Sequence, residues 1–96
     1  MTRKEILDGA AQCVCADREQ SYGNPESNFS LIAAYWTTYK GIEFTAHDIG
    51  MMMALLKVAR IQTGRYKADS YIDGAGYLAC AGELAQTQTQ EWGDTD

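Results

Sequence analysis

The segment from His47 to Gln62 is apolar on almost every side of the helix that its pattern predicts. Its hydrophobic residues are Ile49, Met51, Met52, Met53, Leu55, Leu56, Val58 and Ile61. No polar stripe wide enough for a surface helix remains, so we expect this helix to lie inside a bundle. The same helix carries Lys57 and Arg60, which are three residues apart and therefore neighbours on one face. Buried cations need anionic partners, because an unpaired buried charge is very costly.

Three other stretches carry apolar residues at helical spacing, and they cover residues 3–17, 25–40 and 69–86. Residues 87–96 form a polar C-terminal tail apart from Trp92. No internal repeat and no second region of distinct composition is present. The pattern predicts an all-α fold in which residues 1–86 form a single domain, a compact four-helix bundle.

Capping residues precede each of these helices. They are Thr2 with Glu5, Asn24 before Pro25, Thr45 with Asp48, and Asp69. A Ser or Thr three residues before an acidic residue makes a capping box, and Pro suits the first helical position. Gly41 and Gly64 are the expected ends of the second and third helices.

The net charge of −5 argues against binding of bulk nucleic acid or of an anionic membrane, since both normally need a basic surface. No apolar run is long enough for a membrane span, and the N-terminal residues do not resemble a secretory signal. We therefore expect a cytoplasmic location. Three cysteines are an odd number and fit reduced thiols rather than a disulfide framework.

The candidate chemistry depends on how the last two helices pair. A short turn joins them, so they should pack antiparallel, with Arg60 level with Asp73 and Lys57 one turn further in. Asp69, Asp73 and Tyr77 share the facing side. One interpretation is an internal ion pair between Arg60 and Asp73. A second is a pocket in which Lys57 and Arg60 bind a phosphate or carboxylate. A third is a magnesium site on the two aspartates, although we expect no dedicated cofactor.

A second candidate element is the loop between the first two helices. Arg18 and Tyr22 lie in it, and Asn28 follows in the first turn of the next helix. Backbone N–H groups at that helix start offer a weak anion site, and the alternative is simply a well-capped turn. With Lys67 of the later turn, these residues complete the candidate ligand-binding set.

Several short motifs together resemble a family of small uncharacterised bacteriophage and prophage proteins. They are Asp17-Arg18-Glu19, Tyr22-Gly23, Pro25-Glu26, Asn28-Phe29, Ala33, Trp36, the run from Met52 to Lys57, Ala59-Arg60-Ile61, Thr63-Gly64, Lys67, Asp69-Ser70-Tyr71, Asp73 and Gly76-Tyr77. The resemblance covers residues 2–86 and implies a phage origin and an all-α fold, without an activity.

A weaker likeness is to the all-α nucleoside triphosphate pyrophosphohydrolases, which hold magnesium with acids on two helices. This chain offers Glu5 with Asp8 and Asp69 with Asp73, and it lacks the paired glutamates of that pattern.

The favoured hypothesis is a helical protein without catalytic residues that binds a nucleotide or another phosphate-bearing ligand, for sequestration or counter-defence. One alternative is an interaction module that inhibits a host protein. Another is a magnesium-dependent hydrolase. We also expect a homo-oligomer, because so small a chain carries more apolar surface than it can bury alone.

Overall fold

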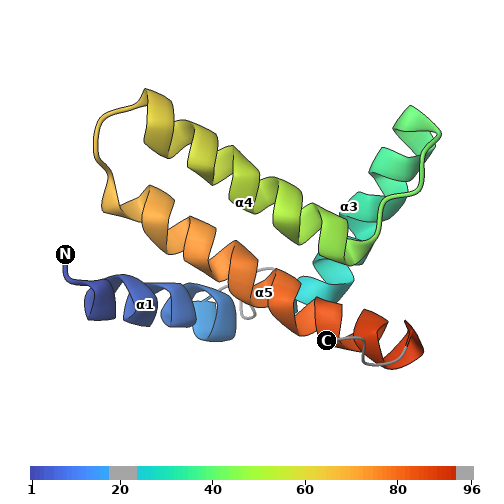
Figure 1. The fold of residues 1–96 in the computed structure, drawn as a ribbon, viewed down its shortest axis with the longest axis horizontal. Coiled ribbons are helices and arrows are strands. Elements are labelled where there is room, and N and C mark those ends of the chain that lie inside the picture. The colour runs from blue at the N-terminus through green and yellow to red at the C-terminus, as the bar shows by residue number, and fades with distance from the viewer. Residues whose placement is uncertain (18–23, 93–96) are drawn as a thin grey trace.

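The computed structural model describes the backbone of residues 1–17 and 24–92 and the side chains of residues 1–15 and 24–86. The elements are α1 (Arg3–Gln12), a π-helical turn η1 (Cys13–Asp17), α3 (Pro25–Lys40), α4 (Ala46–Thr63) and α5 (Ala68–Trp92). The described ranges contain helices and no strand, so the predicted all-α four-helix bundle is confirmed (Figure 1).

In the described ranges, no helix combines the length and the apolar character needed to cross a lipid bilayer.

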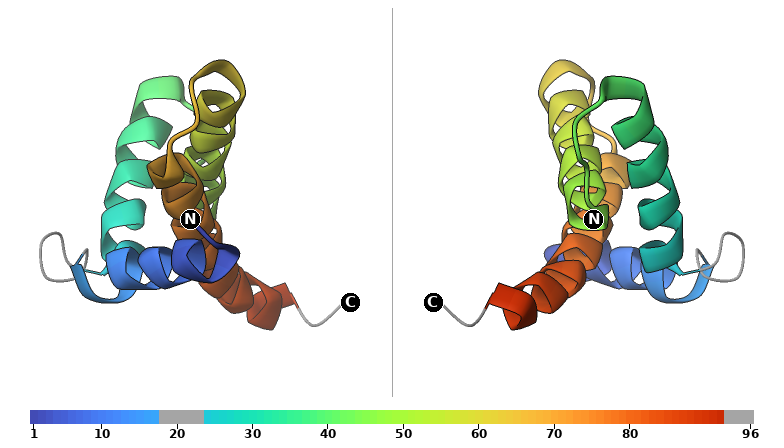
Figure 2. Two further views of the ribbon diagram at one scale, coloured as in Figure 1. Left: turned by 90° about the vertical axis from the view of Figure 1, so that its left-hand side faces the viewer. Right: turned by 90° about the vertical axis from the view of Figure 1, so that its right-hand side faces the viewer.

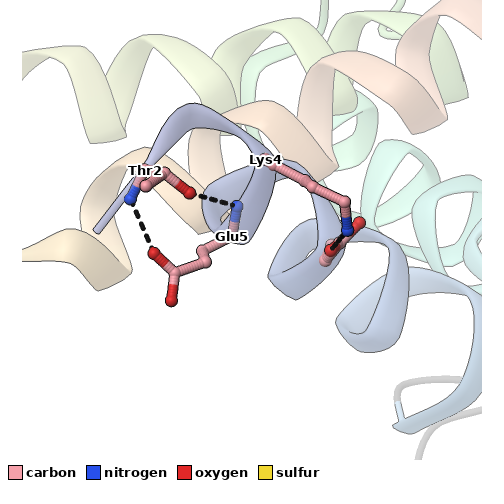
Figure 3. Close-up of polar contacts among 4 residues, drawn as sticks. Thr2, Lys4 and Glu5 are labelled. Atoms are coloured by element: carbon pink, nitrogen blue, oxygen red, sulfur yellow. Dashed lines mark hydrogen bonds and ion pairs between the residues drawn. The ribbon is translucent and has the colours of Figure 1, made fainter.

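The predicted caps of the first three helices are confirmed. Figure 3 shows the capping box of α1, in which the Glu5 carboxylate accepts from the Thr2 backbone N–H and the Thr2 hydroxyl accepts from the Glu5 N–H. The Thr2 backbone N–H, which donates to the carboxylate, is the largest cause that lowers the pKa of Glu5, and the Thr2 side chain is the second. Thr45 and Asp48 make the same arrangement at α4, and the Asn24 side chain caps α3.

The last helix differs from the prediction at both ends. It begins at Ala68, so Asp69 is not the N-cap but an exposed acid inside the first turn, where it still favours the helix dipole. Its backbone continues through Trp92, beyond the expected end at Gln86. The polar composition of residues 87–92 suggested a tail, but Gln and Glu are good helix formers, so a polar stretch of this kind can continue a helix.

The hydrophobic core lies where α3, α4 and α5 meet. Its buried residues are Phe29, Ala33, Ile49 and Cys80. Trp36 and Phe44 pack around them with their rings edge to face. α3 lies to one side of the α4–α5 pair and meets α4 at the end farthest from the turn (Figures 1 and 2). The core is therefore concentrated at one end of that pair.

The two longest helices, α4 and α5, pack as an antiparallel hairpin. A Cβ added at Gly50 would lie 3.0 Å from the Cβ of Ala81, which marks a very close approach of the two backbones. Seven residues further along α4, Lys57 faces Gly74, which is seven residues back along α5. These two contacts fix the register of the hairpin.

The first helix packs on α5 rather than on α4. A Cβ at Gly9 would contact the Ile72 side chain, and one at Gly76 would lie 2.9 Å from Val14. Residue numbers rise in both helices from the first contact to the second. α1 therefore runs parallel to the first half of α5 and beside it (Figure 1).

α4 lies within the bundle, as its apolar pattern predicts, but only one side of it is covered. Its buried residues are Ile49, Gly50 and Ala54, which face α3 and α5. By contrast, the opposite side of the helix is exposed and apolar, and Leu55 retains 62% of its accessible surface. Hydrophobic composition predicted that α4 would be covered, but neighbours in the described structure cover only one side of it.

Candidate functional site

The hairpin brings together the cation and the acid that the sequence placed on facing helices. The Nζ atom of Lys57 lies 3.0 Å from Oδ2 of Asp73. The Lys57 side chain is 14% exposed and that of Asp73 is 38% exposed. The Cβ atom of Lys57 lies beside Gly74, where an added Cβ would meet it at an ordinary contact distance of 3.6 Å. The ammonium group is therefore largely desolvated and held by one carboxylate.

The predicted partner of Asp73 was Arg60, and that pairing is wrong. The observed register puts Arg60 level with Tyr71, because the turn is shorter and α5 starts earlier than the sequence suggested. Arg60 is exposed, and its guanidinium makes no ion pair with any residue whose side chain is described. Its five N–H donors thus face solvent one helical turn from Lys57.

The other members of the expected polar seam separate. Asp69 is exposed at the start of α5 and makes no ion pair within the described side chains. The Tyr77 ring packs beside the core, with its centroid 6.3 Å from that of Phe29. The internal seam is therefore reduced to a single ion pair between Lys57 and Asp73.

The second candidate element is only partly visible. Arg18 and Tyr22 lie outside the described residues. Asn28 is half-buried in the first turn of α3, next to the core residue Phe29. Lys67 is exposed in the turn between α4 and α5, so it belongs with the hairpin rather than with the loop.

Sequence reasoning missed an exposed aromatic pair at the same turn. The rings of Tyr66 and Tyr71 lie 5.8 Å apart between centroids, tilted by 35°. Tyr66 is 66% exposed and Tyr71 is 40% exposed. The available signal was the alternation Arg65-Tyr66-Lys67, since aromatic residues between cations are typical of sites for bases and phosphates.

We call this end of the molecule the hairpin end and define it as Lys57, Arg60, Arg65, Tyr66, Lys67 and Tyr71. Residues 57–67 carry four of the eight Lys and Arg residues of the chain and no acid. The surrounding protein has a net charge of −5, so the hairpin end is a local basic region on an acidic protein. Chemically it offers exposed cationic donors beside an aromatic surface.

A metal centre has less support. In the parts of the chain with described side chains, no three His, Cys, Asp or Glu residues cluster closely enough to hold a metal ion. Asp73 is already engaged by Lys57. The geometry therefore adds nothing to the alternative of a magnesium site on Asp69 and Asp73.

Comparison with known proteins gives a family and two relatives from bacteriophages. The family model described as "Domain of unknown function (DUF6378)" matches residues 5–85. The Gene 55 protein of Mycobacterium phage L5 is 41% identical over 87 residues, which cover 90% of this chain and 54% of that protein. The Gene 55 protein of Mycobacterium phage D29 is 35% identical over 77 residues, covering 80% and 51%.

The chain thus spans about half the length of these curated relatives. No solved structure matches it. The predicted resemblance to a family of small phage proteins is confirmed. The chain belongs to the DUF6378 family of phage proteins.

Proposed function

We propose that the hairpin end binds a phosphate-bearing small molecule of the nucleotide class. The observation that carries the proposal is the exposed ring pair of Tyr66 and Tyr71 within the basic segment of an otherwise acidic protein. Stacking surfaces and cationic donors are the two components that a nucleotide needs.

The cations suit phosphate in two different ways. Arg60 is free to present its planar fork to two oxygens of a phosphate, which a lysine cannot do. Lys57 has three N–H donors, and Asp73 occupies one side of the ammonium. An anion that approached from the open side would complete the coordination of this largely buried charge. Arg65 and Lys67, which are exposed in the turn between α4 and α5, would add electrostatic attraction for the phosphate.

The aromatic pair would supply the contact with the base. An exposed aromatic ring contributes about 1–3 kcal/mol per stacked base. The Tyr66 side chain is the more accessible of the two, while Tyr71 is anchored on the first turns of α5. This division suits Tyr66 as the ring that stacks and Tyr71 as its support.

The biological setting is that of the phage relatives. A protein that binds a nucleotide stoichiometrically in the host cytoplasm could adjust a nucleotide pool or sequester a nucleotide signal of host defence. Such a role needs affinity and does not need turnover, which fits a site built from cations and aromatic rings.

The experiment is a thermal-shift and calorimetric screen with ATP, dTTP, cyclic AMP and cyclic GMP, with and without magnesium. A ligand at a hundred times its Kd should stabilise the protein by about 2.7 kcal/mol. We expect Arg60→Ala and Tyr66→Ala each to reduce affinity at least tenfold while the far-UV circular dichroism stays unchanged.

Matched controls come from α3. Lys40→Ala removes an exposed cation, and Tyr39→Ala removes an exposed ring, both at the opposite end of α4 about 27 Å from the turn. These variants should bind like the original protein. If the control pair reduced affinity as much as the hairpin pair, or if no nucleotide bound, the proposal would fail.

The same screen separates the hydrolase alternative. Release of pyrophosphate or phosphate in the presence of magnesium, abolished by Asp73→Asn, would indicate an enzyme. The interaction-module alternative has a separate structural basis in the exposed face of α4.

A further inference from the structure

Near the turn, α5 carries Tyr71 and Asp73 on opposite sides of the hairpin. Gly74 faces α4, and Ile72 faces α1. Residues two apart on a helix point in nearly opposite directions, so α4 and α1 flank α5 on two sides. Tyr71 and Asp73 come one residue before each of these contact positions and therefore occupy the two sides of α5 that remain.

The side with Asp73 is the one on which α3 packs in the core half. Tyr77, one turn after Asp73, packs beside a core ring of α3. Arg60 lies seven residues after Met53, which packs against the same core. Residues four or seven apart share one face of a helix. Asp73, its ion-pair partner Lys57 and Arg60 therefore lie together, and we call this the ion-pair side.

The opposite side holds the two tyrosines. The Tyr66 ring lies 5.8 Å from that of Tyr71, so both rings belong to this side. Leu78, seven residues after Tyr71 on the same face of α5, is 52% exposed, which shows that α3 does not cover this side. We call it the tyrosine side and define it as Tyr66 and Tyr71. The cations and the rings of the hairpin end are thus separated by the width of a helix.

We propose that the ligand of the hairpin end is a nucleotide with an extended polyphosphate chain, of the nucleoside triphosphate class. Its base stacks on the tyrosine side, and its terminal phosphate binds Lys57 and Arg60 on the ion-pair side. This inference rests on the proposed function and adds the class of ligand. A helix with its side chains is about 10–12 Å across, and a ligand that uses both sides must extend over that width.

The chemistry of the candidate ligands decides between them. In a cyclic mononucleotide the phosphate is bonded to the ribose at two positions, so the charge stays beside the sugar. A monophosphate reaches little further. Two additional phosphoanhydride links carry the terminal phosphate of a triphosphate well away from the base. The path over the turn suits such a chain, because residues 57–68 contain no acid, and Arg65 and Lys67 are exposed there.

The ion-pair side is prepared for a terminal phosphate. The Lys57 ammonium lies 3.0 Å from Oδ2 of Asp73, so its position is set before a ligand arrives. Arg60 is exposed one helical turn away and can place two N–H donors on phosphate oxygens. A terminal phosphate has more free oxygens than a bridging one and can accept from both cations. Lys57 and Arg60 are therefore the residues that should distinguish a triphosphate from a monophosphate.

The test is calorimetric titration with ATP, ADP, AMP and cyclic AMP in EDTA at constant ionic strength. We expect ATP to bind at least tenfold more tightly than AMP or cyclic AMP. Arg60→Met should lower the affinity for ATP by roughly tenfold and leave that for AMP unchanged. Lys57→Met should do the same, and the exposed position of Arg60 makes its variant the one least able to disturb the fold.

Two matched variants separate this selectivity from a general effect. Tyr66→Ala should weaken ATP and AMP by the same factor, because both ligands present the base to the same ring. Lys40→Met removes an exposed cation at the end of α3 and should leave the ratio of the two affinities unchanged. Circular dichroism of each variant verifies that the helices remain folded.

The failures of the two proposals are distinguishable. If no nucleotide binds, the nucleotide site and its ligand class are both wrong. If ATP, AMP and cyclic AMP bind equally well, the nucleotide site stands and the bridging arrangement is wrong. If Arg60→Met and Lys57→Met weaken AMP as much as ATP, a phosphate beside the sugar already reaches the ion-pair side, which would also overturn the inference.

Discussion

The two halves of the α4–α5 hairpin use the same pair of helices for different purposes. In the core half, α3 covers the helices, Ile49 is fully buried, and Gly50 lies against Ala81. In the half near the turn, α3 is absent and the helices carry Lys57, Asp73 and the exposed tyrosine pair. The contrast teaches that α4 is covered by α3 in the core half and is free to carry charges in the turn half, where α1 packs only on α5.

The strongest test of this difference is to truncate one apolar residue in each half and compare the losses of stability. Ile49→Ala leaves a cavity in the core and should reduce the free energy of unfolding by about 2–5 kcal/mol. Leu56→Ala, on the exposed part of α4, should cost about 1 kcal/mol or less. Urea denaturation measures both. Equal losses would mean that the turn half contributes to the core as much as the α3 half.

A pair of glycine substitutions tests how closely the helices approach. Gly50→Val adds atoms against the Ala81 backbone and should destabilise by about 1–3 kcal/mol. At Gly74 a new Cβ would make only an ordinary 3.6 Å contact with Lys57. Gly74→Ala should therefore stabilise α5 by about 0.5–1 kcal/mol. Thermal unfolding measures whether each substitution lowers or raises the midpoint temperature. If both lowered it, the helices would approach as closely at Gly74 as at Gly50, which would contradict the account.

The Lys57–Asp73 ion pair is the next test. A double-mutant cycle with Lys57→Met and Asp73→Asn should give a coupling energy of about 0.5–1 kcal/mol, because Asp73 is partly exposed and solvent weakens the attraction. The coupling should decrease with added salt. An Arg60→Met cycle with the same Asp73 variant is the control and should show no coupling.

The smallest effect concerns the start of α1, which lies outside both halves. The Thr2 capping box lowers the pKa of Glu5 below its ordinary value of 4.5. A carboxylate whose pKa is lower in the folded state stabilises the fold at a pH above its unfolded-state pKa. This stabilisation is lost as the pH falls through its folded-state pKa. The protection factors of amides in the first turn of α1 should therefore fall below pH 4.5, while those of amides in the middle of α4, away from the Asp48 cap, stay unchanged. Glu5→Gln should remove this pH dependence.

The sequence predicted the helices and most caps because those signals are local. Thr45 with Asp48, Asn24 with Pro25, and Gly64 each act within a few residues of a helix end. The prediction of Asp69 as the N-cap was wrong because the helix already begins at Ala68. The earlier helix start changed the predicted register and contributed to the wrong partner for Asp73. Register depends on the turn and on the Gly50–Ala81 contact, neither of which a helical period encodes.

The candidate site was predicted only in part. Lys57 and Asp73 were identified because a cation on an apolar helix requires an acid, and that requirement holds for any register. Tyr66 and Tyr71 were missed because their contact joins the turn to a helix and leaves no periodic signal. The apolar pattern of α4 predicts a buried helix on every side, but Leu55 and Val58 are exposed, because hydrophobicity alone does not say which sides of a helix have neighbours.

An NMR titration with ATP tests the proposed division of the hairpin, since each backbone amide reports its own surroundings. We expect chemical-shift changes to saturate together within residues 57–71, while the amides of Ile49, Phe29 and Cys80 stay unchanged. Changes confined to the core half, or a spectrum unaltered by millimolar nucleotide, would contradict the assignment of ligand binding to the hairpin end.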